Sequence, residues 1–193
     1  MVKDAVRGLA DVITLQVPGP GFIGEGHTAV HVMEGREFAR TDPFIMLADD
    51  RVDLPPGTRA GGPHPHAGFE IVTFAVEGEA RDRDEGLLRA GDVLWMTAGS
   101  GVVHNEDVEP LGKLRILQLW VTLPSLSRWQ APRFKHVARE DTPVRRESGI
   151  EARVEIFSAL RSNEWIARSF GEQSETHWSL ASDVSRICDE LTL

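Results

Sequence analysis

Two short polar pairs in this sequence could do chemistry. His64 and His66 are separated by one residue in the stretch GGPHPHAGFE, and His104 and Glu106 are separated by one residue in GVVHNED. In an extended strand, residues i and i+2 point to the same face, so each pair can direct two donor groups into one cavity. If the two strands are neighbours, three imidazoles and one carboxylate converge on a single point. This pattern predicts a metal site.

The histidine pair has a second interpretation that the residues alone leave open. Pro65 lies between the two histidines and has no N–H group, which places the segment at a strand start or a sheet edge. Taken alone, such a pair is equally compatible with two solvent-exposed loop histidines. The later pair, His104 and Glu106, favours a shared site. Three neutral imidazole nitrogens with one carboxylate suit Fe(II), and also Mn, Ni, Cu or Zn.

Glu70 is a further candidate for this site. On an alternating strand it has the same parity as His64 and His66, so parity does not exclude it. With Glu106 also available, the ion would have five protein donors and little open coordination. One glutamate is therefore expected to lie outside the ligand set and to orient a histidine. Both Glu106 and Glu70 are candidate catalytic bases.

The elements that must position these residues are strands. The segment 69–77, FEIVTFAVE, is apolar on both faces, which is typical of a strand inside a sandwich or barrel. Further strands are expected at 28–33, 93–96, 102–106 and 114–123, and a loop is expected at 49–63 because of its Pro and Gly content. The charge run 82–85 is expected to be a solvated hairpin tip. Short strands and glycine corners predict an all-β sandwich or barrel.

Length and composition limit the function classes. A chain of 193 residues and 21.3 kDa can form one full core with room for a smaller second lobe. The net charge of −9 argues against direct nucleic-acid binding and leaves a protein partner open. The single Cys188 cannot form an internal disulfide, which fits a reducing compartment. With no apolar leader and no window long enough to span a membrane, we expect a cytoplasmic protein.

Three motifs together resemble the pirin family of the cupin superfamily over about residues 40–134. The motifs are GGPHPHAGFEIVTFAVEGE, AGDVLWMTAGSGVVHNE and LRILQLWVTLP. The resemblance implies a cupin β-barrel or jelly roll. It implies that His64, His66, His104 and Glu106 match the metal ligands of pirins, with iron as the usual metal, and that Glu70 has a supporting role.

The resemblance also implies a function. Pirins are known as iron-dependent quercetin 2,3-dioxygenases and, in eukaryotes, as nuclear transcriptional cofactors. By that likeness we expect an oxidoreductase that binds one divalent metal ion, most simply Fe(II), and acts on a flavonol such as quercetin with dioxygen. The alternative is a non-enzymatic iron-binding redox sensor or transcriptional cofactor that acts through protein–protein contacts.

The sequence departs from the family pattern in two places. The residue after the second histidine is usually arginine in this family and here is Ala67, which could change the anionic ligand that is preferred. Pirins contain two cupin lobes, whereas the C-terminal part of this chain has too few β residues for a complete one. We therefore expect a metal-binding cupin domain at 1–135 and a short, incomplete second lobe at 136–193. Apolar surface left uncovered by that lobe would favour a homodimer or a protein partner.

Overall fold

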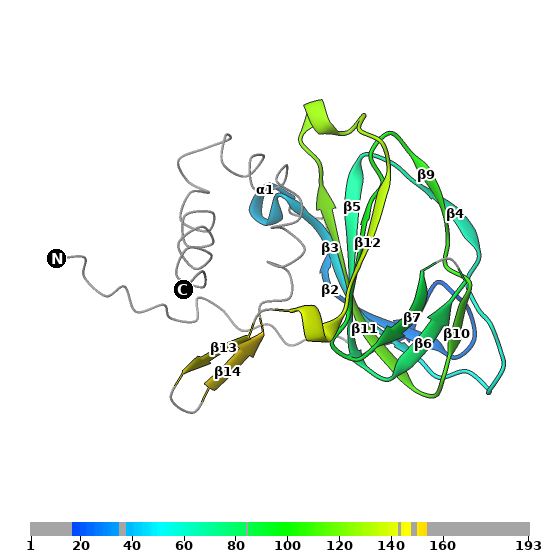
Figure 1. The fold of residues 1–193 in the computed structure, drawn as a ribbon. Helices are drawn as coiled ribbons and strands as arrows, with labels where there is room; N and C mark the ends of the chain where they lie inside the picture. Colours follow the sequence, from blue (N-terminus) through cyan, green and yellow to red (C-terminus); the bar gives the residue numbers. More distant parts are fainter. Residues whose placement is uncertain (1–16, 35–37, 84, 143, 148–149, 154–193) are drawn as a thin grey trace.

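Two facing layers of antiparallel strands make up most of the described part of the chain, so the mainly β, cupin-like fold expected from the sequence is confirmed (Figure 1). The structure is a computed structural model that describes residues 17–34, 38–83, 85–142, 144–147 and 150–153. The expected C-terminal lobe falls mostly in residues 154–193, outside the described residues. Within the described residues, no helix has the length and apolar character needed to cross a membrane.

One layer is a sheet of seven strands, whose spatial order differs from their order in the chain. Its strands are, in spatial order, β1 (Gly19–Pro20), β2 (His27–Glu34), β3 (Phe44–Val52), β11 (Leu114–Thr122), β5 (Phe69–Glu77), β8 (Val93–Thr97) and β12 (Arg133–Val137). Because β12 pairs with β8, the sheet extends two residues past the domain boundary expected at 135.

The facing layer consists of two smaller sheets. One contains β10 (Val108–Pro110), β6 (Glu79–Asp82) and β7 (Gly86–Arg89), and the other contains β4 (Pro63–His66) and β9 (Val102–Asn105). The remaining elements are a hairpin of β13 (Val144–Glu147) and β14 (Ile150–Arg153), the single helical turn α1 (Phe38–Thr41), and 3₁₀ turns at Ser125–Ser127 and Arg139–Asp141. In Figure 1, β4 and β9 lie across from β5 and β12.

The central strand β5 has both faces occupied, as its apolar pattern predicts. On the face turned toward β4 and β9, Phe69 stacks on Trp120 of β11 with ring centroids 4.8 Å apart. On the opposite face, Val72 belongs to a buried apolar cluster with Val93 and Trp95. The strand therefore separates the barrel interior from a second apolar layer.

The loop expected at 49–63 begins later than predicted, because β3 continues to Val52. Asp49 is buried within that strand, where Arg115 of the neighbouring β11 donates two hydrogen bonds of 2.8 Å to its carboxylate. These bonds, together with the charges of Arg115 and Arg51, hold the pKa of Asp49 below its usual value although burial acts in the opposite direction. Because its carboxylate is paired with Arg115, Asp49 can be buried in β3, although the composition of the segment predicts a loop there.

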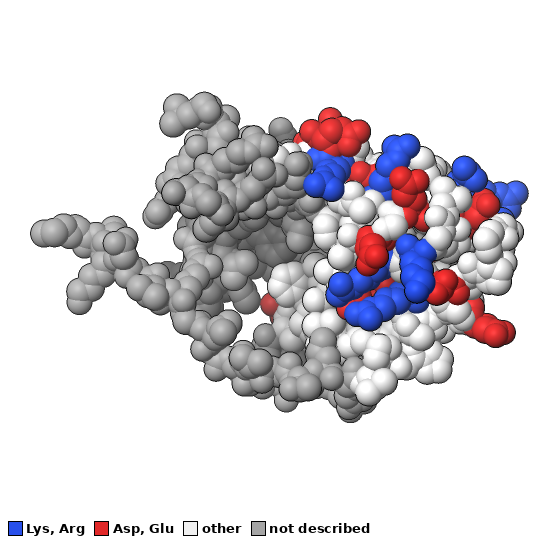
Figure 2. Space-filling view, turned by 90° about the horizontal axis from the view of Figure 1, so that it is seen from below, with Lys and Arg blue, Asp and Glu red and all other residues white. Residues whose placement is uncertain are grey.

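Charges of both signs are interspersed on the face seen in Figure 2. Arg59 forms ion pairs with Asp107 at 2.7 Å and with Glu109 at 3.2 Å. Arg81 also contacts Glu109, at 3.3 Å. Basic side chains on β6 and in the loop before β4 are therefore paired with acidic neighbours, which leaves no one-signed basic patch among these residues of the kind that phosphate backbones require.

Candidate metal centre

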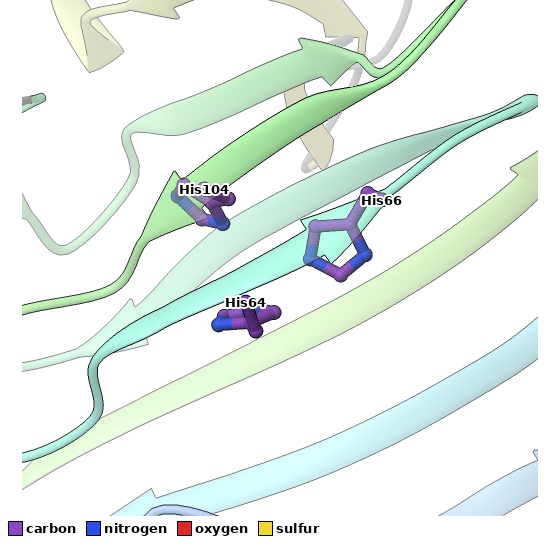
Figure 3. Close-up of side chains that lie close together, drawn as sticks. All are labelled: His64, His66 and His104. Atoms are coloured by element: carbon purple, nitrogen blue, oxygen red, sulfur yellow. The ribbon is translucent and has the colours of Figure 1, made fainter.

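The pairing of β4 with β9 brings the two sequence clusters together. The strands are antiparallel, and their register places His64 directly opposite His104 and His66 opposite Val102. Because residues opposite each other point to the same face, all three histidines face the barrel interior. Figure 3 shows the three rings close together, two carried by β4 and one by β9, and one ring nitrogen from each lies within 4.8 Å of the others.

Hydrogen bonds fix which nitrogen His64 and His104 present to the centre. His64 donates from Nδ1 to the carbonyl oxygen of Gly62 at 2.9 Å, so its Nε2 keeps a free lone pair. His104 donates from Nε2 to Glu85 Oε1 at 2.9 Å. Its Nδ1 is buried and has no hydrogen-bond partner in the described structure. A carboxylate that accepts from the outer nitrogen of a histidine is the arrangement that orients metal-binding histidines.

Glu85 lies in the charge run 82–85, for which the expectation of a solvated tip is wrong at two positions. The side chain of Glu85 is only 15% exposed. Asp82 is buried, and its Oδ1 accepts a hydrogen bond from the backbone N–H of Glu85 at 2.8 Å. The hairpin between β6 and β7 therefore folds inward at this point. Alternating charges in a sequence do not reveal which member turns toward the interior.

Glu106 lies beside two of the three histidines. Its Oε2 is 3.9 Å from His64 Nε2, and its Oε1 is 4.0 Å from His104 Nδ1. Gln118 of β11 donates from Nε2 to Glu106 Oε1 at 3.3 Å and accepts from Trp120 Nε1 at 3.2 Å. Trp120 and Gln118 belong to the seven-stranded sheet, so these two hydrogen bonds position the Glu106 carboxylate from the opposite layer of the barrel. Sequence reasoning missed Gln118, although a lone amide in the apolar strand LRILQLWVT was an available signal.

Burial shapes the protonation of this cluster. The pKa of His66 is lowered to about 4, first because burial disfavours the charged ring and then because His64 and His104 lie nearby. For His104, burial also lowers the pKa, but the hydrogen bond to Glu85 and the charges of Glu106 and Glu85 outweigh it, so the pKa lies above the usual value. Burial raises the pKa of Glu106, opposed by the charges of His104 and His64.

The lowered pKa of His66 predicts how the metal-free protein responds to acid. Because the folded state holds a pKa of about 4 and the unfolded state one of 6.5, the unfolded state binds the proton more readily between these values. Stability contributed by the neutral ring is therefore lost as pH falls from 6.5 toward 4. Between pH 7 and pH 5, the free energy of unfolding of the metal-free wild type should fall by about 2 kcal/mol more than that of His66→Gln.

Urea unfolding of both metal-free proteins at the two pH values measures this difference. His104 and Glu106 are present in both chains, so their titrations largely cancel in the comparison. Parallel pH dependences would mean that His66 is solvated rather than buried beside the other two rings.

The structure does not bring Glu70 to the cluster. Glu70 lies opposite Thr97 across β5 and β8, on the sheet face turned away from Trp120. Its Oε2 accepts from Trp95 Nε1 at 3.0 Å and its Oε1 accepts from Thr97 Oγ1 at 2.7 Å. Glu70 does not keep the parity with His64 and His66 that a continuous strand would give, because the chain turns at Gly68, between β4 and β5.

Aromatic rings form the wall of the centre next to His66. The ring of His66 meets Phe69 edge-on at 5.4 Å and Trp120 edge-on at 5.6 Å. Phe134 of β12 lies near His104, with ring centroids 6.1 Å apart. Flat apolar surfaces beside a polar cluster suit a ligand that is itself planar and aromatic.

The donor set fits a divalent transition metal. The unpartnered His104 Nδ1 is a buried lone pair, and a buried polar atom without a partner costs free energy unless something binds it. His64 Nε2 is likewise left free by the bond from Nδ1. Three imidazoles and one neighbouring carboxylate are ligands of borderline softness, which bind Fe, Mn, Ni, Cu and Zn rather than Ca or Mg.

Comparison with known sequences gives a family match. Residues 26–121 match the sequence model of the family described as Pirin. Pirin-1 of Arabidopsis thaliana is 40% identical over 118 residues, which are 58% of this chain and 39% of that protein. A pirin-like protein of Solanum lycopersicum is 36% identical over 136 residues, 68% of this chain and 45% of that protein. The chain thus spans about half the length, or less, of these curated relatives.

Solved structures resemble the described fold. A crystal structure of a Geobacillus kaustophilus protein superposes with a TM-score of 0.60 at 35% identity and covers 74% of this chain and 57% of its own. The structure of a quercetin 2,3-dioxygenase from Acinetobacter baumannii gives a TM-score of 0.58 at 30% identity, with 67% of this chain and 49% of that chain covered. Both likenesses support the fold around the histidine cluster.

Proposed function

Residues 26–121 of this chain belong to the pirin family of cupins, and we propose that the protein is a metal-dependent dioxygenase that opens the ring of flavonols such as quercetin. The observation that carries the proposal is the cluster of His64, His66 and His104 beside Glu106, walled by Phe69 and Trp120. A similar solved structure is of a quercetin 2,3-dioxygenase. Such an enzyme needs a metal, a flat apolar surface and a proton acceptor in one place.

The three histidines and Glu106 would hold the metal, and iron(II) is the ion we propose. His64 would bind through Nε2 and His104 through Nδ1, because the other nitrogen of each ring donates a hydrogen bond. Four protein donors leave room for exogenous ligands on an ion that prefers six. A bound divalent ion supplies Lewis acidity, which lowers the pKa of a flavonol hydroxyl group and polarises the substrate.

Glu106 is the residue we assign as proton acceptor. Burial raises the pKa of its carboxyl group, which makes it a stronger base than a solvated glutamate. Gln118 fixes one carboxylate oxygen from the opposite strand. Glu70 we assign to support of the barrel, since Trp95 and Thr97 occupy both of its oxygens on the far face of β5.

Oxygen consumption tests this function. Protein loaded with Fe(II) should consume dioxygen on addition of quercetin and bleach its visible absorption, and it should leave the spectrum unchanged without oxygen. Glu106→Gln should remove most of the turnover, roughly 100-fold or more if the carboxylate is the base. Glu79→Gln, at an exposed carboxylate of the three-stranded sheet, is the matched control. Identical spectra with and without oxygen would end the dioxygenase proposal.

The competing function is a non-enzymatic metal sensor or protein-binding cofactor. It uses the same donor set, and the exposed apolar side chains Leu126, Trp129 and Phe134 are surface that a partner could cover. A protein that binds iron with all four donors intact, yet consumes no oxygen with any flavonol, would favour this role over catalysis.

A further inference from the structure

A cavity of about 340 Å³ lies next to the histidine cluster. Its walls include Ala67 from the segment that joins β4 to β5, Phe69 at the start of β5, and Thr122 at the end of β11. Phe69 is a shared wall, because it lines the cavity and its ring meets the ring of His66 at 5.4 Å. The volume falls within the range of small-molecule pockets, which begins at about 300 Å³.

A single cation lines this cavity. Arg128 follows the 3₁₀ turn Ser125–Ser127 and extends over Gly68, where a Cβ would lie 3.7 Å from Arg128 Cδ. Its Nε donates to the carbonyl oxygen of Leu123 at 2.9 Å, which anchors the guanidinium at its inner edge. Of the described residues that line the cavity, Arg128 is the only one that carries a charge. The chain has a net charge of −9, whereas the lining of this cavity is positively charged and therefore attracts an anion.

Aromatic surface accompanies this cation. Trp129, the next residue, also lines the cavity, and it is 81% exposed. A tryptophan so exposed contributes little to the core and offers a flat apolar face to a ligand. Phe69 provides a second ring on the inner wall. Ala67, which has a small side chain, also lines the cavity.

We propose that this cavity binds a small planar aromatic carboxylate. The ring of the ligand packs against Trp129 and Phe69, and its carboxylate accepts charge-assisted hydrogen bonds from the guanidinium of Arg128. An aliphatic anion lacks the ring that the apolar walls require, and a neutral aromatic leaves the guanidinium unpaired. The site contains none of the three histidines, so this inference stands whether or not the metal centre opens flavonols.

Calorimetric titration of the metal-free 193-residue chain with two matched probes tests the proposal. 2-Naphthoate and 2-naphthalenemethanol share the ring and differ in charge. Wild type should bind naphthoate roughly tenfold or more tightly than the alcohol, because one charge-assisted hydrogen bond contributes about that difference in affinity. Arg128→Gln should reduce this preference to about one, whereas Trp129→Ala should weaken both probes.

Two further variants keep the result interpretable. Loss of the bond to Leu123 in Arg128→Gln could disturb the loop, so Arg128→Lys serves as a control that retains the positive charge. It should keep part of the preference for naphthoate over the alcohol. Arg133 is an exposed arginine that contacts Gln130 and does not line the cavity, so Arg133→Gln should leave the preference for naphthoate unchanged. Equal binding of both probes by wild type, or naphthoate binding that survives Arg128→Gln, would overturn the proposal.

Discussion

His64→Ala should lower the melting temperature of the metal-loaded protein by about 10 °C and leave that of the metal-free protein nearly unchanged. A metal that binds only the folded state, at ~1,000 times its dissociation constant, adds about 4 kcal/mol to the free energy of unfolding. His64 donates one hydrogen bond, to Gly62, and its side chain is 28% exposed, so its loss should cost the metal-free fold little. Thermal melting with and without chelator measures both values.

The matched control is His136→Ala, at a histidine outside the cluster that contacts Asp92 at 3.2 Å. It should shift the two melting temperatures by the same amount, because it removes a structural contact and no metal ligand. His104→Ala should resemble His64→Ala, with a larger effect on the metal-free protein because Glu85 loses its partner. Equal shifts of loaded and metal-free protein for His64→Ala would show that the histidine is structural.

Glu85→Ala should weaken metal binding by about 10- to 100-fold, the usual effect of removing a group that orients a metal-binding histidine. The carboxylate of Glu85 holds the proton of His104 on Nε2 and thereby leaves Nδ1 free to bind. Without it, the imidazole can rotate and can place its proton on the wrong nitrogen. Competition for the metal with a chelator of known affinity measures the change.

Glu85→Gln separates orientation from charge. Its amide oxygen can still accept from His104 Nε2, so the ring keeps its orientation while the negative charge is lost. We expect an affinity between those of wild type and Glu85→Ala. Nitrogen-15 spectra of the metal-free protein should show His104 protonated on Nε2 in wild type and mixed tautomers in Glu85→Ala. An unchanged affinity in Glu85→Ala would mean that the 2.9 Å contact does not position the ring.

Local sequence pattern was sufficient for strands β2, β5, β8, β9 and β11 and for the facing direction of each polar pair. The apolar pattern of β5 gave its bounds, Phe69–Glu77, and its burial on both sides. The alternation of His64 and His66 gave two donors on one face of β4. These features follow from backbone geometry within a few residues, because side-chain direction in a strand repeats every second residue.

Contacts between residues that are far apart in the sequence could not be predicted from local pattern. The turn at Gly68 breaks the parity that would have placed Glu70 with the histidines, and the hairpin between β6 and β7 turns Glu85 inward against His104. Gln118 reaches Glu106 only because β11 faces β9 across the barrel. Each of these contacts depends on how whole strands are placed, which local periodicity does not encode.

The kinds of donor groups, their spacing and the mainly β fold that holds them can be predicted from the amino-acid sequence. The folded structure is needed to establish which nitrogen of His104 is free, which glutamate lies beside the histidines, and where Arg128 and Trp129 meet a cavity. The physical reason is range: strand alternation acts between adjacent residues, whereas hydrogen bonding and burial depend on neighbours that the chain reaches only after it has folded.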